Sequence, residues 1–264
     1  MSHAIRHYMV SRSLRGLSWL AWLLPACLAH GQQIDIANER DPSVAKQLEA
    51  GQRLLKQGIP DTAISKYFDP IIRSYESKYR RPGVVVYSAH SNTEALLYSV
   101  MRAAAGADGQ SSAQVSTIVL DGAWADALEL KAYELVEMQR DDEALKVLQE
   151  AIQLAPSWPV VWAELGNIYQ TRRQWADAAD AYQQVESAAE LMEEGDAKIA
   201  MKTRGWRGQG YVLTETNRLD EAEAMYRKCL ALDPNDSGSR NELAYIQSLR
   251  EKSAPSGPQT PAPQ

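Results

Sequence analysis

The sequence predicts an all-α protein whose helices pair into hairpins, stack as a solenoid and end in a capping helix. Apolar and small residues recur every 34 residues over residues 125–192, and the same pattern returns over residues 203–236. A unit of this length is one helical hairpin, which cannot cover its own apolar face, so at least about three units must stack. Pro156 and Pro234 close two of the repeats, because the residue before a proline avoids the helical region.

The first 31 residues have the pattern of an export signal. Arg6, Arg12 and Arg15 form a basic start, an apolar run follows over residues 17–29, and small residues flank His30. A basic segment, a short apolar segment and a small-x-small site together are typical of a secretory signal peptide. We therefore expect cleavage after Gly31 and a periplasmic or secreted protein.

Two other interpretations of this segment remain open. Residues 24–27 resemble a bacterial lipobox, in which Cys27 would be lipidated and anchor the protein, although Pro25 fits that motif poorly. The segment could also stay as an uncleaved anchor, but its apolar run is shorter than the about 20 residues that a membrane helix needs. Once the signal is removed, the sequence predicts no integral membrane span.

Less regular elements precede the clear repeats. We expect an N-terminal linker over residues 32–43 and a divergent repeat over residues 44–77. Four residues of this repeat match the pattern of the regular repeats described below, namely Gly51, Leu54, Ala63 and Tyr67.

Residues 78–124 are predicted to be a helical insertion. Within it, residues 91–105 have a helical pattern, and Gly106 to Gly109 form a turn. The type of the apolar, β-branched run at residues 115–120 stays open, and one interpretation of the whole insertion is a degenerate helical pair.

Regular repeats are predicted at residues 125–158, 159–192 and 203–236. Residues 193–202 form a junction insertion, which we expect to lengthen the first helix of the last repeat from Asp196. In each predicted hairpin, one small residue on each helix lets the two helices approach closely. An aromatic residue on the second helix fills the space toward the next unit.

The chain is predicted to end in a capping helix and a tail. The helix spans residues 237–251 and carries Leu243, Ile246 and Leu249 on one face, which leaves the polar outer face that a solenoid end needs. Residues 252–264 are rich in proline and are predicted to be disordered.

The residues at the recurring places resemble those of the tetratricopeptide repeat (TPR) family. In the second regular repeat they are Trp162, Leu165, Gly166, Tyr169, Ala178, Tyr182, Val185 and Glu190. In the third they are Trp206, Gln209, Gly210, Leu213, Ala222, Tyr226, Cys229 and Pro234. The family pattern is Trp/Leu, Leu, Gly/Ala, Tyr/Leu, Ala, Phe/Tyr, Ala, Pro. Three residues depart from it, namely Lys131 in the first regular repeat, Glu190 in the second and Gln209 in the third. The resemblance implies a right-handed solenoid. With such a leader it also implies a bacterial envelope protein, most simply a periplasmic one.

The sequence offers little catalytic or cofactor chemistry. The formal charge of −6 disfavours nucleic acid as the main partner, because phosphate binding needs clustered Lys and Arg. Two cysteines cannot build a four-thiolate zinc site, and neither a nucleophile elbow nor a Gly-rich phosphate loop after a strand occurs. After cleavage His90 is the only histidine, and we expect it to be structural or at the surface. We therefore expect no enzyme, no metal and no cofactor.

The TPR resemblance places the binding surface on the first helix of each repeat, which lines a concave groove. The implied groove residues are Asp126, Glu129, Tyr133, Glu137, Asn167, Gln170, Arg204, Arg207, Tyr211 and Glu215. One end of such a groove would be acidic and the other basic, which would orient a bound peptide by complementary charge. The alternative is that these residues are merely solvated helix faces.

Some TPR proteins grip a peptide carboxylate with Lys and Asn residues from successive first helices. In this chain Asn167 and Arg204 stand at matching places, but Ala163 and Gly208 occupy the other two. The clamp is incomplete, so we do not predict binding of chaperone tails.

The sequence therefore predicts an exported scaffold or assembly factor that holds a peptide or partner protein in its groove. The alternative is an immunity or inhibitor protein that binds one folded enzyme or toxin, through the insertion at residues 78–124. The identity of the partner and the oligomeric state do not follow from the sequence.

Overall fold

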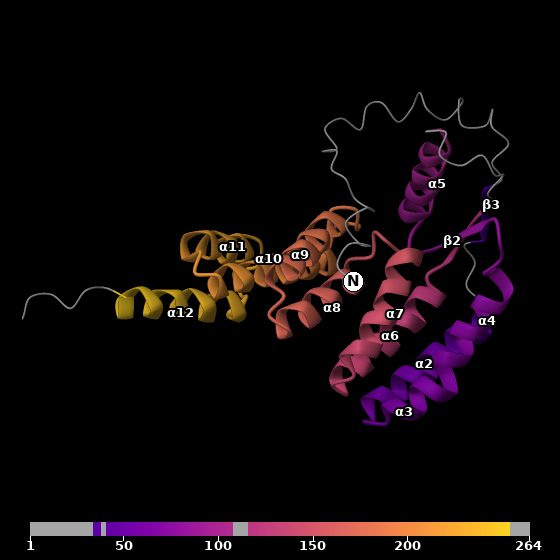
Figure 1. The fold of residues 1–264 in the computed structure, drawn as a ribbon, viewed down its shortest axis with the longest axis horizontal. Helices are drawn as coiled ribbons and strands as arrows, with labels where there is room; N and C mark the ends of the chain where they lie inside the picture. Colours follow the sequence, from indigo (N-terminus) through magenta and orange to yellow (C-terminus); the bar gives the residue numbers. More distant parts are fainter. Residues whose placement is uncertain (1–33, 38–40, 108–115, 254–264) are drawn as a thin grey trace, which may run out of the picture.

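A computed structural model of the protein describes residues 34–37, 41–107 and 116–253. The predicted signal peptide with Cys27, and nearly all of the predicted tail, lie outside the described residues. The described part is a row of packed helices with a small sheet near one end and α12 (Ser237–Ser253) at the other (Figure 1). None of its helices is both long enough and apolar enough to cross a membrane.

The N-terminal part alternates strands and helices. The elements in chain order are β1 (Ile34–Ala37), α2 (Pro42–Lys56), α3 (Pro60–Ala63), the π-helix Ile64–Phe68, α4 (Asp69–Tyr79), β2 (Val84–Ala89), α5 (Asn92–Ala107) and β3 (Ser116–Asp121). The π-helix joins α3 to α4 without a break.

The three strands form one parallel sheet in the order β1-β3-β2, so the prediction of an all-α fold is wrong for this part. Ile34 pairs with Thr117, and Val84 pairs with Ser116. The predicted linker thus contains a strand, and the described residues of the predicted helical insertion form two strands beside α5. The valines and isoleucines of β2 and β3 favour strands. The middle strand, β3, is mostly buried, as expected for a parallel sheet that is covered on both faces.

The two faces of the sheet belong to different cores. On one face Ala89 and Val119 pack with Ala95 and Tyr98 of α5. On the other face Leu120 joins the main core. The sheet is therefore built into the protein, and it lies between α5 and the main core.

The remaining helices form three antiparallel pairs and a cap. They are α6 (Ala123–Glu137), α7 (Asp141–Leu154), α8 (Pro159–Thr171), α9 (Trp175–Ala189), α10 (Asp196–Glu215), α11 (Leu219–Leu232) and α12. α10 begins at Asp196, within the predicted junction insertion. At the cap, Ile246 of α12 packs on Ala222 and Tyr226 of α11.

Equivalent residues make equivalent turns and contacts in these pairs. The loop between the two helices of each pair contains one non-glycine residue in the left-handed region, at Gln139, Arg173 and Asn217. A Cβ added at Gly166 would lie 2.8 Å from the Tyr182 ring, and one added at Gly210 would lie 2.8 Å from the Tyr226 ring. Only glycine therefore lets the aromatic ring of the second helix pack directly on the backbone of the first.

Candidate binding groove

The first helices of the three pairs, α6, α8 and α10, lie side by side and carry all ten predicted groove residues. None of the ten belongs to the buried core. Tyr133, Glu137 and Glu215 are exposed, and the other seven are half-buried. Their side chains are thus available at a surface, but their individual contacts decide which of them a ligand could meet.

At one end of the groove, the loop after β2 covers Asp126. His90 Nε2 lies 3.0 Å from Asp126 Oδ1, and the His90 backbone N–H donates to Glu94 Oε2 at 2.7 Å. The centroid of the Trp158 ring, just before α8, lies 4.1 Å from the centroid of the His90 imidazole. The insertion thus contributes a side chain to the groove, a contact that the sequence could not reveal because 36 residues separate His90 from Asp126.

This histidine is a cation at neutral pH. Burial lowers the pKa of His90, but hydrogen bonds with Asp126 and Glu94, together with their negative charges, raise it from 6.5 to about 9. The imidazolium therefore neutralises part of the acidic end of the groove. Its role is structural, because it fastens the loop after β2 to the first turn of α6.

Arg204, predicted to lie at the basic end of the groove, is paired with a neighbouring helix. Arg204 donates to Glu164 Oε1 of α8 at 2.7 Å, and Glu164 is only 4% exposed. A buried carboxylate needs such a partner, because an unpaired buried charge is strongly destabilising. Arg204 therefore fastens α10 to α8.

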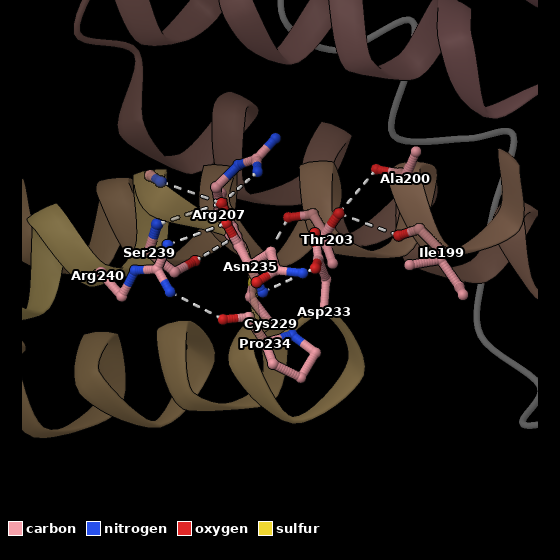
Figure 2. Close-up of polar contacts among 12 residues, drawn as sticks. Ile199, Ala200, Thr203, Arg207, Cys229, Asp233, Pro234, Asn235, Ser239 and Arg240 are labelled. Carbon is pink, nitrogen blue, oxygen red and sulfur yellow. Dashed lines mark hydrogen bonds and ion pairs between the residues drawn. The ribbon is translucent and has the colours of Figure 1, made fainter. Parts of the chain in front are cut away.

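Arg207 is occupied in the same way at the next junction. Its Nη1 donates to Asp236 Oδ1 at 2.8 Å, and Ser239 Oγ donates to Asp236 Oδ2 at 2.7 Å. Figure 2 shows Arg207 and Ser239 converging on this network between α10 and the start of α12. Burial raises the pKa of Asp236, but the hydrogen bonds from Ser239 and Arg207 outweigh it, and the pKa is lowered. The groove therefore has no free cation at either of the two predicted arginines.

Glu129 differs from its neighbours because it makes no hydrogen bond or ion pair within the described part of the chain. Burial raises its pKa to about 7, with further contributions from the negative charges of Glu164 and Asp126. Tyr133 lies one helical turn further along α6 on the same face and is 42% exposed. A largely buried carboxylate and an accessible aromatic side chain thus lie one helical turn apart on α6.

The remaining predicted groove residues are mostly polar and lie farther along the helices. The Tyr182 hydroxyl donates to Gln170 Oε1 at 2.9 Å, and the ring of Tyr211 lies 6.4 Å from the ring of Trp175. Glu137 and Glu215 end their helices in solvent. With the arginines and the histidine paired, the available charge on this surface is acidic.

Neither a metal-binding cluster nor an exposed thiol occurs in the described part of the chain. No group of three His, Cys, Asp or Glu side chains in the described ranges is placed to hold a metal ion. Cys229 is buried between helices, where burial raises the pKa of its thiol.

Comparison with protein families matches tetratricopeptide repeat models to residues 125–157, 161–193 and 207–236. The chain is a TPR-containing protein. These matches overlap all three predicted regular repeats and correspond to the pairs α6–α7, α8–α9 and α10–α11. The comparison with curated proteins finds no match.

The comparison with solved structures gives matches at low sequence identity. A MamA RS-1 ArsTM double mutant is 13% identical, with a TM-score of 0.50 over 81% of this chain and 88% of its own. The first TPR of Spaghetti (RPAP3), bound to an HSP90 peptide, is 23% identical, with a TM-score of 0.39 over 48% of this chain and 93% of its own. The Sgt2 TPR domain from Aspergillus fumigatus is 16% identical, with a TM-score of 0.42 over 53% and 90%. The MamA likeness supports the fold of the TPR protein.

Proposed function

We propose that this TPR protein is a protein–protein interaction scaffold or assembly factor that holds a partner polypeptide against α6, α8 and α10. The observation that carries the proposal is the accessible surface on these three helices, where exposed Tyr133 adjoins unpaired Glu129. Aromatic side chains that remain accessible are frequent anchors in protein interfaces. A surface that served only as a solvated helix face would gain nothing from a half-buried carboxylate without a partner.

Site-specific photo-crosslinking tests the proposal. A photoreactive phenylalanine in place of Tyr133 should crosslink a partner in the cells that make the protein, and unlabelled protein should compete. The matched control carries the same group in place of Gln149, an exposed residue on α7, the second helix of the same pair. Crosslinks of equal yield and identity from both positions would contradict binding in the groove.

We also propose that the protein acts in the bacterial envelope, after export by the signal at residues 1–31. The support is the basic, apolar and small-residue pattern of that segment. Mass spectrometry of the mature N-terminus tests it. A mature chain that begins at Gln32 supports cleavage, a lipidated Cys27 supports anchoring, and a chain that keeps Met1 contradicts both.

A second candidate function is binding of one folded enzyme or toxin, as an immunity or inhibitor protein. The observation in its favour is the outer face of α5, where Leu96 is 58% exposed and Met101 is 41% exposed. Deleting the insertion is no clean test, because β3 is part of the core. The pair Leu96→Asp and Met101→Asp instead leaves the core intact. Loss of the partner with this pair, but not with groove variants, favours the second function.

A further inference from the structure

We propose that the groove around Glu129 and Tyr133 is a subsite for a cationic side chain, arginine or lysine, of the bound partner polypeptide. This inference rests on the proposed function and specifies the chemistry of its ligand. It follows from an imbalance of charge that the protein leaves uncorrected on its own.

The cluster contains more carboxylates than cations. Four carboxylates gather here, namely Glu94, Asp126, Glu129 and Glu164. Against them stand two cations, His90 and Arg204. Each cation is already bonded: His90 lies between Glu94 and Asp126, and Arg204 donates to Glu164. Glu129 is left without a hydrogen bond or ion pair of its own within the described part of the chain.

The position of Glu129 is costly for a carboxylate. Its largest perturbation is burial, and the next two are the negative charges of Glu164 on α8 and Asp126 on its own helix. Arg204 on α10 and His90 in the loop after β2 oppose these effects, but the pKa still rises to about 7. A cation from outside would stabilise the ionised carboxylate and lower its pKa again.

Tyr133 supplies the second half of the subsite. Residues four apart lie on the same face of a helix, so the ring stands one turn beyond Glu129. An arginine guanidinium or a lysine ammonium can lie over a tyrosine ring within about 6 Å of its centroid while it bonds a carboxylate. The ring is 42% exposed and is free to be covered.

Other ligands fit less well. An acidic segment would meet the excess negative charge of the cluster. A metal ion has no set of three suitable side chains in the described part of the chain. An uncharged segment would bury Glu129 further without supplying the missing charge, at a cost in desolvation.

Selection of peptides tests the inference. A random library of twelve-residue peptides is selected on the full mature chain, and in parallel on the Glu129→Gln variant. The matched control is Glu193→Gln, which removes the same charge from an exposed position outside α6, α8 and α10. We expect peptides rich in Arg or Lys on the wild type and on Glu193→Gln, and no such enrichment on Glu129→Gln.

Each outcome has a distinct meaning. Peptides that bind without basic enrichment, but compete with the Tyr133 crosslink, overturn the cationic subsite and leave the proposed function standing. A library that yields no peptide competing with that crosslink overturns the proposed groove binding itself. Enrichment of Arg alone or of Lys alone identifies which of the two cations the subsite takes.

The pH dependence of binding gives an independent readout. If a basic peptide holds Glu129 ionised, its affinity should rise about tenfold from pH 6 to pH 8, because the free carboxylate titrates near 7. The rise should persist in Glu193→Gln and vanish in Glu129→Gln. Circular dichroism confirms that the variants fold. A rise of equal size in Glu129→Gln would overturn the assignment.

Discussion

The unpaired carboxylate of Glu129 should make the free protein less stable as the pH rises toward neutrality. Its pKa is about 7 in the folded protein against 4.5 when unperturbed. The folded state therefore binds more protons than the unfolded state between these values, and stability falls as pH increases through them. At 1.36 kcal/mol per unit, the full loss is about 3 kcal/mol, and most of it falls between pH 5 and pH 8.

The variant Glu129→Gln removes this titration and nearly preserves the shape of the side chain. It should therefore be close to the wild type in stability at pH 5 and more stable by about 2–3 kcal/mol at pH 8. Urea unfolding at both pH values measures the difference, and comparing the two proteins cancels the titration of groups that they share. Glu137→Gln should stay within about 0.5 kcal/mol of the wild type at both pH values.

One outcome would refute the reasoning. If the stability difference between Glu129→Gln and wild type were the same at pH 5 and pH 8, Glu129 would be ionised without penalty. The burial and the neighbouring charges of the cluster would then be compensated by something other than protonation. The cationic subsite would lose its physical basis, although the groove could still bind a polypeptide by other contacts.

Three further variants test the fold around the groove. Trp206→Ala should cost about 3–5 kcal/mol by leaving a cavity, because Trp206 is 9% exposed, and an unchanged melting temperature would show that the repeat register is wrong. His90→Gln should lower stability at pH 6.5, and the deficit should shrink as the wild type loses its proton through pH 9, since a raised histidine pKa stabilises only below it. Gln139→Gly should raise the free energy of unfolding by about 0.5–1 kcal/mol in urea titrations, because Gln139 has a φ of 60° and glycine adopts this conformation freely; a loss would show that its side chain contributes contacts.

The repeats could be predicted from the sequence because their determinants are local. Gly166 and Tyr182 lie within one hairpin of 34 residues, and the contact that forces the glycine is made inside that hairpin. The same argument holds for Gly210 and Tyr226. The repeat period in the sequence thus reflects a contact made within each hairpin.

The sheet could not be predicted in the same way, because its pairing is long-range. Ile34 pairs with Thr117 across more than eighty residues, and β1 has only four residues. Short apolar runs of this kind do not distinguish a buried strand from a helix segment by periodicity. The helix between β2 and β3 was recognisable, since the predicted range 91–105 nearly coincides with Asn92–Ala107.

The charge of the groove depends on partners that no repeat position identifies. Arg204 meets Glu164 from the preceding repeat, Arg207 meets Asp236 from the start of the cap, and His90 arrives from outside the repeats. In each pairing, a charged side chain that could have met a ligand instead holds two elements together. The sequence predicts a basic end of the groove, but both arginines there are paired within the protein. Glu129 is the side chain that stays unpaired, and the proposed ligand would supply its partner. The proposed recognition thus depends on which charges the packing of the repeats leaves unpaired.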